Sequence, residues 1–172
     1  MSKLKPPVGG KDHIQGNKNA AIELVEYGDY QCPHCGRAYP IIKSIQEKMG
    51  DKLKFVFRNF PLAEVHPNAT NAAVAAEAAA LQGKFWEMHD IIFEHQEHLG
   101  DSHLVKYAAR IGLDVAKFTV DFETPAVLDK VEGDFESGAL SGVNGTPTFF
   151  INGERYNRSW EEDDLLYYLR SK

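Results

Sequence analysis

The chain has 172 residues, of which 43% are hydrophobic, including 10 Phe and 7 Tyr, so it can form one domain with a sizeable core. Its net charge of −6 argues against a general nucleic-acid-binding surface, which is usually basic. No apolar run approaches the ~18 residues of a membrane-spanning helix, so no membrane insertion is expected. The start of the chain has lysines but no apolar segment after them. This predicts a cytoplasmic protein as written, or a periplasmic or other extracytoplasmic one if a leader was removed.

The first part of the chain predicts a strand–helix–strand unit. Residues 1–11 are rich in Lys, Pro and Gly and are expected to be flexible. A short edge strand at 12–16 precedes a strand at 21–27 that is rich in β-branched and apolar residues. A helix follows from about residue 32 to residue 49, and the next strand covers 53–60. Two strands joined by a helix in this way are expected to be parallel.

The middle of the chain predicts only helices. Alanine-rich and amphipathic patterns, separated by Gly or by capping residues, place these helices at 67–82, 84–98, 101–111, 114–123 and 126–140. Residues 61–140 contain 14 Asp and Glu against 5 Lys and Arg. Such an excess of acidic residues is typical of a solvated surface rather than of a binding site.

The last part of the chain returns to strands. A strand at 148–151 is followed by Asn152-Gly153, which predicts a two-residue hairpin turn. A returning strand at 154–156 and an amphipathic helix at 160–169 complete the chain.

Together the elements predict an α/β fold, with a βαβ unit first, a ββα unit last and an all-helical insertion between them. Residues 12–60 and 141–172 are expected to form one domain, and residues 61–140 the inserted one.

Both cysteines lie in one motif, Cys32-Pro33-His34-Cys35, between a strand and the start of a helix. This setting is that of a thioredoxin-like redox site. Two cysteines are too few for a zinc site with four cysteine ligands. Half of a zinc site or a structural disulfide are the alternatives, and the strand–turn–helix context argues against both.

The position of the motif assigns different roles to the two sulfurs. A cysteine at a helix N-terminus faces unpaired N–H groups and the positive end of the helix dipole, so the pKa of Cys32 is expected to be low. His34 can donate a hydrogen bond or offer a positive charge. Cys35 lies one turn inside the helix and is expected to be more buried. We therefore expect Cys32 to form mixed disulfides and Cys35 to resolve them, with a stable Cys32 thiolate making the protein an oxidant.

A second motif, Gly-Thr-Pro-Thr-Phe-Phe-Ile-Asn-Gly at 145–153, places Pro147 directly before a strand. A proline in this position is a candidate for a cis peptide, and the neighbouring backbone can pair with an extended substrate.

In this order the two motifs resemble the DsbA-like branch of the thioredoxin superfamily. The stretches at 60–62, 66–69 and 82–90 resemble members of that branch as well. The resemblance covers roughly residues 12–170. It implies a thioredoxin fold with an inserted helical domain and no bound cofactor. It also implies disulfide exchange with protein or peptide thiols, and a redox partner, not identified by the sequence, that recycles the disulfide.

The resemblance also assigns roles to the residues of the first motif. Cys32 matches the family's nucleophile, Cys35 its partner, and Pro33 and His34 the dipeptide that tunes them.

Three further residues match the family's site. Pro147 matches a cis proline that faces the cysteines, and Thr146 the variable residue before it. Glu26 matches an acidic residue beneath the site, where a carboxylate can take up or relay the proton of Cys35. A solvated or ion-paired glutamate is the alternative for Glu26, and Arg58 on the next strand is a candidate partner for it.

Other readings of the site stay open. A disulfide isomerase or a reductase would use the same residues, and a peptide-binding or chaperone module would reuse the fold without the chemistry. The resemblance also implies that apolar surface around the first motif, with Tyr30 and Phe149, is a candidate peptide groove. No metal site is expected, because the nearby histidines lack further ligands in a metal-binding pattern; they are expected to be exposed or to cap helices. These histidines are His89, His95, His98 and His103.

Overall fold

The computed structural model describes residues 2–172 and has one five-stranded sheet surrounded by helices. The strands are β1 (His13–Gly16), β2 (Ile22–Gly28), β3 (Leu53–Asn59), β4 (Thr148–Ile151) and β5 (Glu154–Tyr156). The helices are α1 (Pro33–Met49), α2 (Ala69–Ala80), α3 (Phe85–Glu94), α4 (Asp101–Arg110), α5 (Val115–Phe122), α6 (Pro125–Leu140) and α7 (Glu162–Arg170), with a short 3-10 helix at Gly50–Lys52. The predicted strands and helices are all present, with bounds that differ by a few residues, and the predicted α/β fold class is confirmed.

The strands follow the order β1-β3-β2-β4-β5 across the sheet. β2 and β3 are parallel, as predicted from the helix between them, and the other three pairs are antiparallel. Asn152 and Gly153 both have positive φ, of 49° and 83°, which is the backbone of the predicted hairpin turn between β4 and β5.

Alternation along the central strand divides the core between the two faces of the sheet. On one face, Leu24 belongs to a large apolar cluster that includes buried side chains of α1 and α7. On the other face, Val25 and Tyr27 belong to a smaller cluster with Phe150 and the N-terminal Leu4. A side chain on β2 therefore meets either the helices α1 and α7 or the N-terminal segment, depending on whether its number is even or odd.

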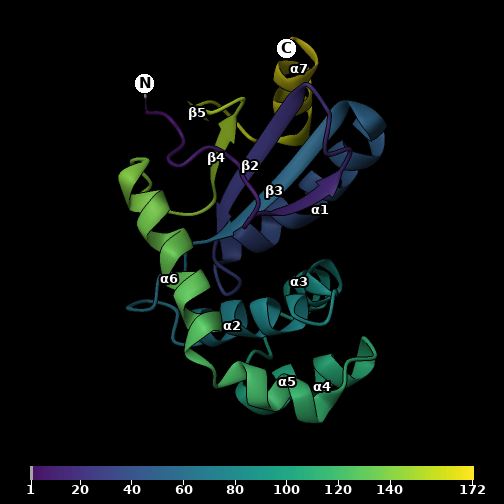
Figure 1. Ribbon diagram of the computed structural model, residues 1–172. Helices are drawn as coiled ribbons and strands as arrows, with labels where there is room; N and C mark the ends of the chain where they lie inside the picture. Colours follow the sequence, from purple (N-terminus) through teal and green to yellow (C-terminus); the bar gives the residue numbers. More distant parts are fainter. Residues whose placement is uncertain (1) are drawn as a thin grey trace.

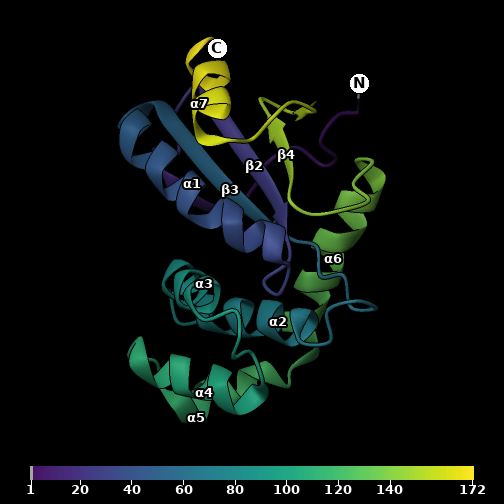
Figure 2. The ribbon, with the colours of Figure 1, turned by 180° about the vertical axis from the view of Figure 1, so that it is seen from behind.

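The remaining helices lie at one end of the sheet (Figures 1 and 2). α2, α3, α4 and α5 form the lower half of the molecule in Figure 1, and α6 runs from them up to the sheet. One cluster of buried apolar side chains joins the sheet, α1 and the helices of residues 61–140. The division into a domain of 12–60 and 141–172 and an inserted domain of 61–140 stays a prediction. Within residues 2–172, none of the helices has the length and apolar content that a bilayer crossing requires.

The N-terminal residues lie on the sheet rather than projecting from it. Leu4 is buried, and its N–H donates to the Gly153 carbonyl at 2.8 Å. Lys3 pairs with Glu154 of β5 in an antiparallel bridge. We expected residues 1–11 to be flexible because of their composition, but apolar burial and strand-like pairing hold this segment in place. Met1 lies outside the described residues.

Candidate active site

The Cys32 side chain sits at the point where the turn after β2 becomes α1. Cys32 occupies the N-cap position of the helix, and Pro33 takes the first helical position, where its missing N–H costs no hydrogen bond. The Cys32 N–H donates to the Asp29 carbonyl at 3.1 Å, and the Cys32 carbonyl accepts from Gly36 at 3.0 Å. The backbone thus turns sharply and leaves the first N–H groups of α1 directed at the cysteine sulfur.

Both cysteines are free thiols with little exposed area. Cys32 is 4% exposed and Cys35 is completely buried. This is the order expected from the sequence, with the N-terminal sulfur outside. Pro33 and His34, between them, are exposed.

The loop before β4 lies against Cys32. The Thr146–Pro147 peptide is cis, and the Cys32 thiol donates to the Thr146 carbonyl at 3.7 Å. The Thr146 hydroxyl oxygen is buried and has no hydrogen-bond partner among residues 2–172. This hydroxyl is a donor that a Cys32 thiolate can use.

The surroundings of Cys32 favour its thiolate. Once Cys32 is ionised, its sulfur can accept from the Cys35 thiol, from the Thr146 hydroxyl and from the backbone N–H groups of Cys35 and His34. These donors lower the pKa of Cys32 from 9.0 to about 5, against the opposing effect of partial burial. At neutral pH the outer sulfur is therefore mainly ionised.

The inner sulfur has the opposite preference. Burial, the hydrogen bond to Cys32 and the negative charges of Glu26 and Cys32 raise the pKa of Cys35 well above its usual range. The Asp29 N–H, which donates to the Cys35 sulfur at 3.5 Å, opposes this only in part. Cys35 is therefore protonated unless a base removes its proton.

Glu26 lies on β2, between Phe57 of β3 and Phe149 of β4. It is 3% exposed, and the structure records no hydrogen bond or ion pair to its carboxylate from residues 2–172. Burial and the negative charge of Cys32 raise its pKa from 4.5 to about 8. A carboxyl that titrates near neutrality, and whose charge acts on both sulfurs, can accept or release a proton during their chemistry.

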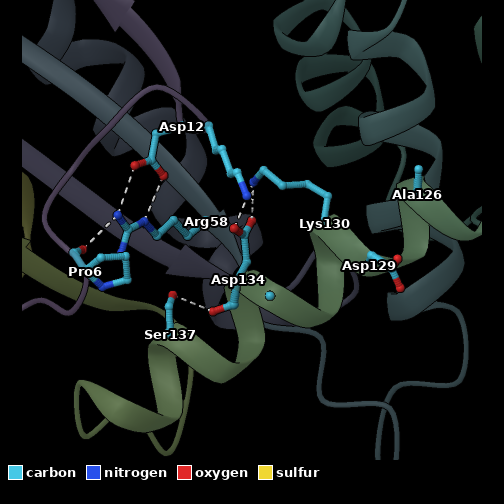
Figure 3. A pocket seen from close by; sticks show the side chains of 10 residues that line it. Pro6, Asp12, Arg58, Ala126, Asp129, Lys130, Asp134 and Ser137 are labelled. Atoms are coloured by element: carbon cyan, nitrogen blue, oxygen red, sulfur yellow. Dashed lines mark hydrogen bonds and ion pairs between the residues drawn. The ribbon is translucent and has the colours of Figure 1, made fainter.

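The sequence interpretation was wrong about the partner of Glu26. Arg58 pairs with Tyr27 in the register of β2 and β3, so its side chain leaves the sheet on the opposite face from Glu26. There it binds Asp12 at 2.8 and 2.9 Å and donates to the Pro6 carbonyl (Figure 3). Neighbouring positions along a strand point to opposite faces of the sheet, so Arg58 cannot meet Glu26.

Two expectations about exposure also need correction. Tyr30 and Phe149 are buried in the core, so neither forms an exposed peptide groove. His89 is buried too, although we expected the histidines to be exposed or to cap helices. It is surrounded by aromatic rings and hydrogen-bonds the Tyr30 hydroxyl at 3.0 Å. Within residues 2–172, no group of three His, Cys, Asp or Glu side chains is placed to hold a metal ion.

Sequence reasoning missed two residues that hold the turn before α1. Asp29 is buried and accepts hydrogen bonds from Leu62 and His66 at 2.9 and 2.7 Å. Gln96, which follows α3, donates to two carbonyls of the same turn. The position of Asp29 three residues before Cys32 was a usable signal. For Gln96 there was none, because its role depends on packing between distant segments.

The arrangement supplies three groups that thiol–disulfide exchange can use. It has an ionised outer sulfur, a protonated inner sulfur and a carboxyl group whose pKa lies between the pKa values of the two sulfurs. The seven residues singled out in the sequence come from three segments. Cys32 caps α1, and Pro33, His34 and Cys35 lie in its first turn. Glu26 lies on β2, and Thr146 and Pro147 lie before β4.

Comparison with known proteins agrees with this fold. Residues 9–170 match the family model described as Thioredoxin. The solved structure of oxidised BdbD from Bacillus subtilis superposes with a TM-score of 0.86 at 23% identity, covering 99% of this chain and 96% of that one. A thioredoxin-like oxidoreductase from Silicibacter pomeroyi DSS-3 superposes with a TM-score of 0.84 at 24% identity, covering 95% and 92% of the two chains.

Curated relatives with higher identity are much longer proteins. The chain is 42% identical over 173 residues to "Na(+)/H(+) antiporter NhaA 1" of Mycobacterium sp. (strain KMS), and covers 28% of that protein. It is 43% identical over 159 residues to "Na(+)/H(+) antiporter NhaA" of Herminiimonas arsenicoxydans, and covers 25% of it. The chain therefore spans about a quarter of the length of these relatives.

Proposed function

Because the chain belongs to the thioredoxin family, we propose that it is a thiol–disulfide oxidoreductase that exchanges disulfides with protein thiols through Cys32 and Cys35, acting as a dithiol oxidase. The observation that carries the proposal is the unequal pair of sulfurs. Cys32 sits at the open end of α1 with a pKa of about 5, and Cys35 is buried with a raised pKa. The solved structures of similar fold include "the thiol-disulfide exchange protein alpha-DsbA2 from Wolbachia pipientis".

The proposed reaction starts from the oxidised protein, in which the two sulfurs form a disulfide. A substrate thiolate attacks the Cys32 sulfur, the disulfide breaks, and Cys35 leaves as a thiolate. Because the pKa of Cys35 is high, this thiolate takes a proton, and Glu26 in its protonated form is a nearby donor. A second substrate thiolate then attacks the substrate sulfur of the mixed disulfide and releases the Cys32 thiolate. Two electrons pass from the substrate dithiol to the protein, and the substrate gains a disulfide.

The low pKa of Cys32 supports the oxidising direction. At pH 7, a pKa of about 5 instead of 9.0 stabilises the reduced form by a factor of about 100. This corresponds to about 3 kcal/mol, or roughly 60 mV for a two-electron couple. The thiolate is therefore a good leaving group, and the reduced protein needs a redox partner to be oxidised again. A disulfide isomerase or a reductase would use the same two sulfurs, but its reduction potential would differ from that of an oxidase.

The function is tested by equilibrating the protein with glutathione buffers and measuring its reduction potential. We expect a potential clearly above the roughly −270 mV of cytosolic thioredoxin. A value at or below that level would contradict the oxidase and support a reductase. In the same assays, Cys32→Ser is expected to abolish oxidation of a dithiol peptide, and Cys35→Ser to accumulate the mixed disulfide with it. If Cys32→Ser abolished this oxidation but left the cellular phenotype unchanged, a peptide-binding module without redox chemistry would be favoured.

A further inference from the structure

The turn that presents Cys32 is held by a side chain from a distant part of the chain. Gln96 follows α3, and its amide nitrogen donates to the Tyr30 carbonyl and to the Cys32 carbonyl, both at 2.9 Å. A glutamine amide has two N–H groups, so one side chain satisfies both acceptors. The two carbonyls belong to the short segment between β2 and α1.

Gly36 provides the space that this contact requires. A Cβ atom at position 36 would lie 2.0 Å from the Gln96 amide oxygen and 2.7 Å from the amide carbon. No side chain larger than hydrogen fits there while the amide keeps its position. Glycine inside a helix is otherwise unfavourable relative to alanine. The glycine in the first turn of α1 and the glutamine after α3 therefore form one fitted contact.

The contact bears on the sulfur because of where the held carbonyls lie. The Cys32 carbonyl also accepts from the Gly36 N–H, the first hydrogen bond of α1, so Gln96 fixes the backbone on which the helix begins. The direction of the Cys32 side chain follows from this backbone, as do the N–H groups that face its sulfur. On the other side of the turn, the Gln31 side chain accepts from the Asn68 N–H at 2.8 Å.

We propose that Gln96 is a positioning residue for the exchange reaction, which holds the turn before α1 so that the Cys32 sulfur faces the Thr146–Pro147 loop. This inference rests on the proposed function, since it concerns how the same site is kept in its reactive geometry. It makes the end of α3 part of the reactive site, although this segment supplies no group that reacts. Loss of the amide is expected to lower the reactivity of Cys32 without removing any atom that touches the substrate.

A matched pair of variants separates this role from a structural one. Gln96→Met keeps length and volume but removes both donors. Gln82→Met is the control, because Gln82 also binds backbone with its amide, donating to the Asp114 carbonyl at 3.1 Å and accepting from its N–H at 2.9 Å. We expect Gln96→Met to raise the pKa of Cys32 by about one unit, which slows alkylation by iodoacetamide at pH 5 about fivefold. Gln82→Met should leave the pKa and the rate unchanged.

A second variant tests the same contact without touching Gln96. In Gly36→Ala the methyl group displaces the amide, so the pKa of Cys32 should rise as it does in Gln96→Met. In a Gln96→Ala background the same Gly36→Ala change should leave this pKa unchanged and raise the melting temperature, because alanine favours the helix. This variant also decides the question if Gln96→Met fails to fold.

The outcomes distinguish this inference from the proposed function. If Gln96→Met and Gly36→Ala lower the melting temperature but leave the alkylation profile and the reduction potential unchanged, Gln96 is only structural and the inference fails. If Cys32 of the unaltered protein titrates near 9, the proposed oxidase function is contradicted by that measurement alone, whatever the variants show.

Discussion

Two buried glutamates of this molecule have opposite titration behaviour. Glu26 lies on β2 within the electrostatic influence of the cysteines, without a recorded partner among residues 2–172, and burial raises its pKa to about 8. Glu77 on α2 is buried to a similar degree, and burial would raise its pKa as well. There, however, hydrogen bonds and positive charge outweigh burial, and the pKa of Glu77 is lowered.

The partners of Glu77 come from three other elements. His13 of β1 binds one oxygen at 2.8 Å, and Asn59 at the end of β3 donates to the other at 2.8 Å. Lys130 of α6 lies 3.8 Å away and also binds Asp134 at 2.8 Å (Figure 3). A buried carboxylate surrounded in this way links several elements and has a structural role. The same group without partners can instead carry a proton. The hydrogen-bond and charge partners of a buried glutamate, and not its degree of burial, therefore decide whether it is structural or titrates near neutrality.

The largest effect on stability is expected when the Glu77 carboxylate is removed. Glu77→Ala removes the buried acceptor that His13, Asn59 and Lys130 share, so the free energy of unfolding should fall by about 3 to 5 kcal/mol. Urea denaturation measures this, with Glu64→Ala on the exposed loop as the control within about 0.5 kcal/mol. The pKa of Cys32 should not change. A loss no larger than that of the control would contradict the structural role of Glu77.

A somewhat smaller effect is expected in the pH dependence of stability, with opposite signs for the two glutamates. The folded-state pKa of Glu26 is raised from 4.5 to about 8, so its favourable contribution is complete below pH 4.5 and is lost as the pH rises to 8. Glu26→Gln should therefore become more stable than the unaltered protein by up to about 3 kcal/mol at pH 7, with no such gain at pH 4.

Glu77→Gln provides the contrast for that measurement. The pKa of Glu77 is lowered in the folded state, so its contribution is present above pH 4.5 and is lost on acidification. The deficit of Glu77→Gln should therefore shrink as the pH falls. Unfolding curves between pH 3 and pH 9 cover both ranges, below pH 4.5 for Glu77 and between pH 4.5 and 8 for Glu26, and parallel slopes for the two variants would remove the distinction between the glutamates.

The smallest effect concerns the coupling of Glu26 to the sulfur. The negative charge of Cys32 contributes to the raised pKa of Glu26. Capping Cys32 with the neutral product of iodoacetamide should lower the pKa of Glu26 by roughly half a unit to one unit. The carboxyl band of Glu26 in infrared spectra against pH, assigned by its loss in Glu26→Gln, measures this shift. An unchanged titration would mean that the two groups act independently.

The sequence predicted the parts of the fold and of the site that depend on local patterns. The strand–turn–helix around Cys32 follows from a β-branched run, a proline at the first helical position and the short spacing of the cysteines. The hairpin at Asn152-Gly153 follows from the positive φ that these two residues tolerate. Position within an element also separated the outer from the inner sulfur.

What the sequence did not predict depends on contacts between segments far apart in the chain. Arg58 was assigned to the wrong face because pairing register decides which strand neighbours meet. The partners of Glu77 come from β1, β3 and α6, and no spacing rule connects these elements. His89 is buried because aromatic rings from several elements surround it. The sequence does not show that these elements meet, so an exposed or capping histidine was expected instead.

The N-terminal segment has a consequence for handling the protein. β5 is the outer strand at one side of the sheet, and the Arg155 N–H donates to the Ser2 carbonyl at 3.0 Å. Together with Leu4, which donates to Gly153, this segment occupies hydrogen-bonding groups that an open edge would offer to another molecule. A version shortened to begin at residue 12 would keep every reactive group but would be prone to edge-to-edge association during expression and storage.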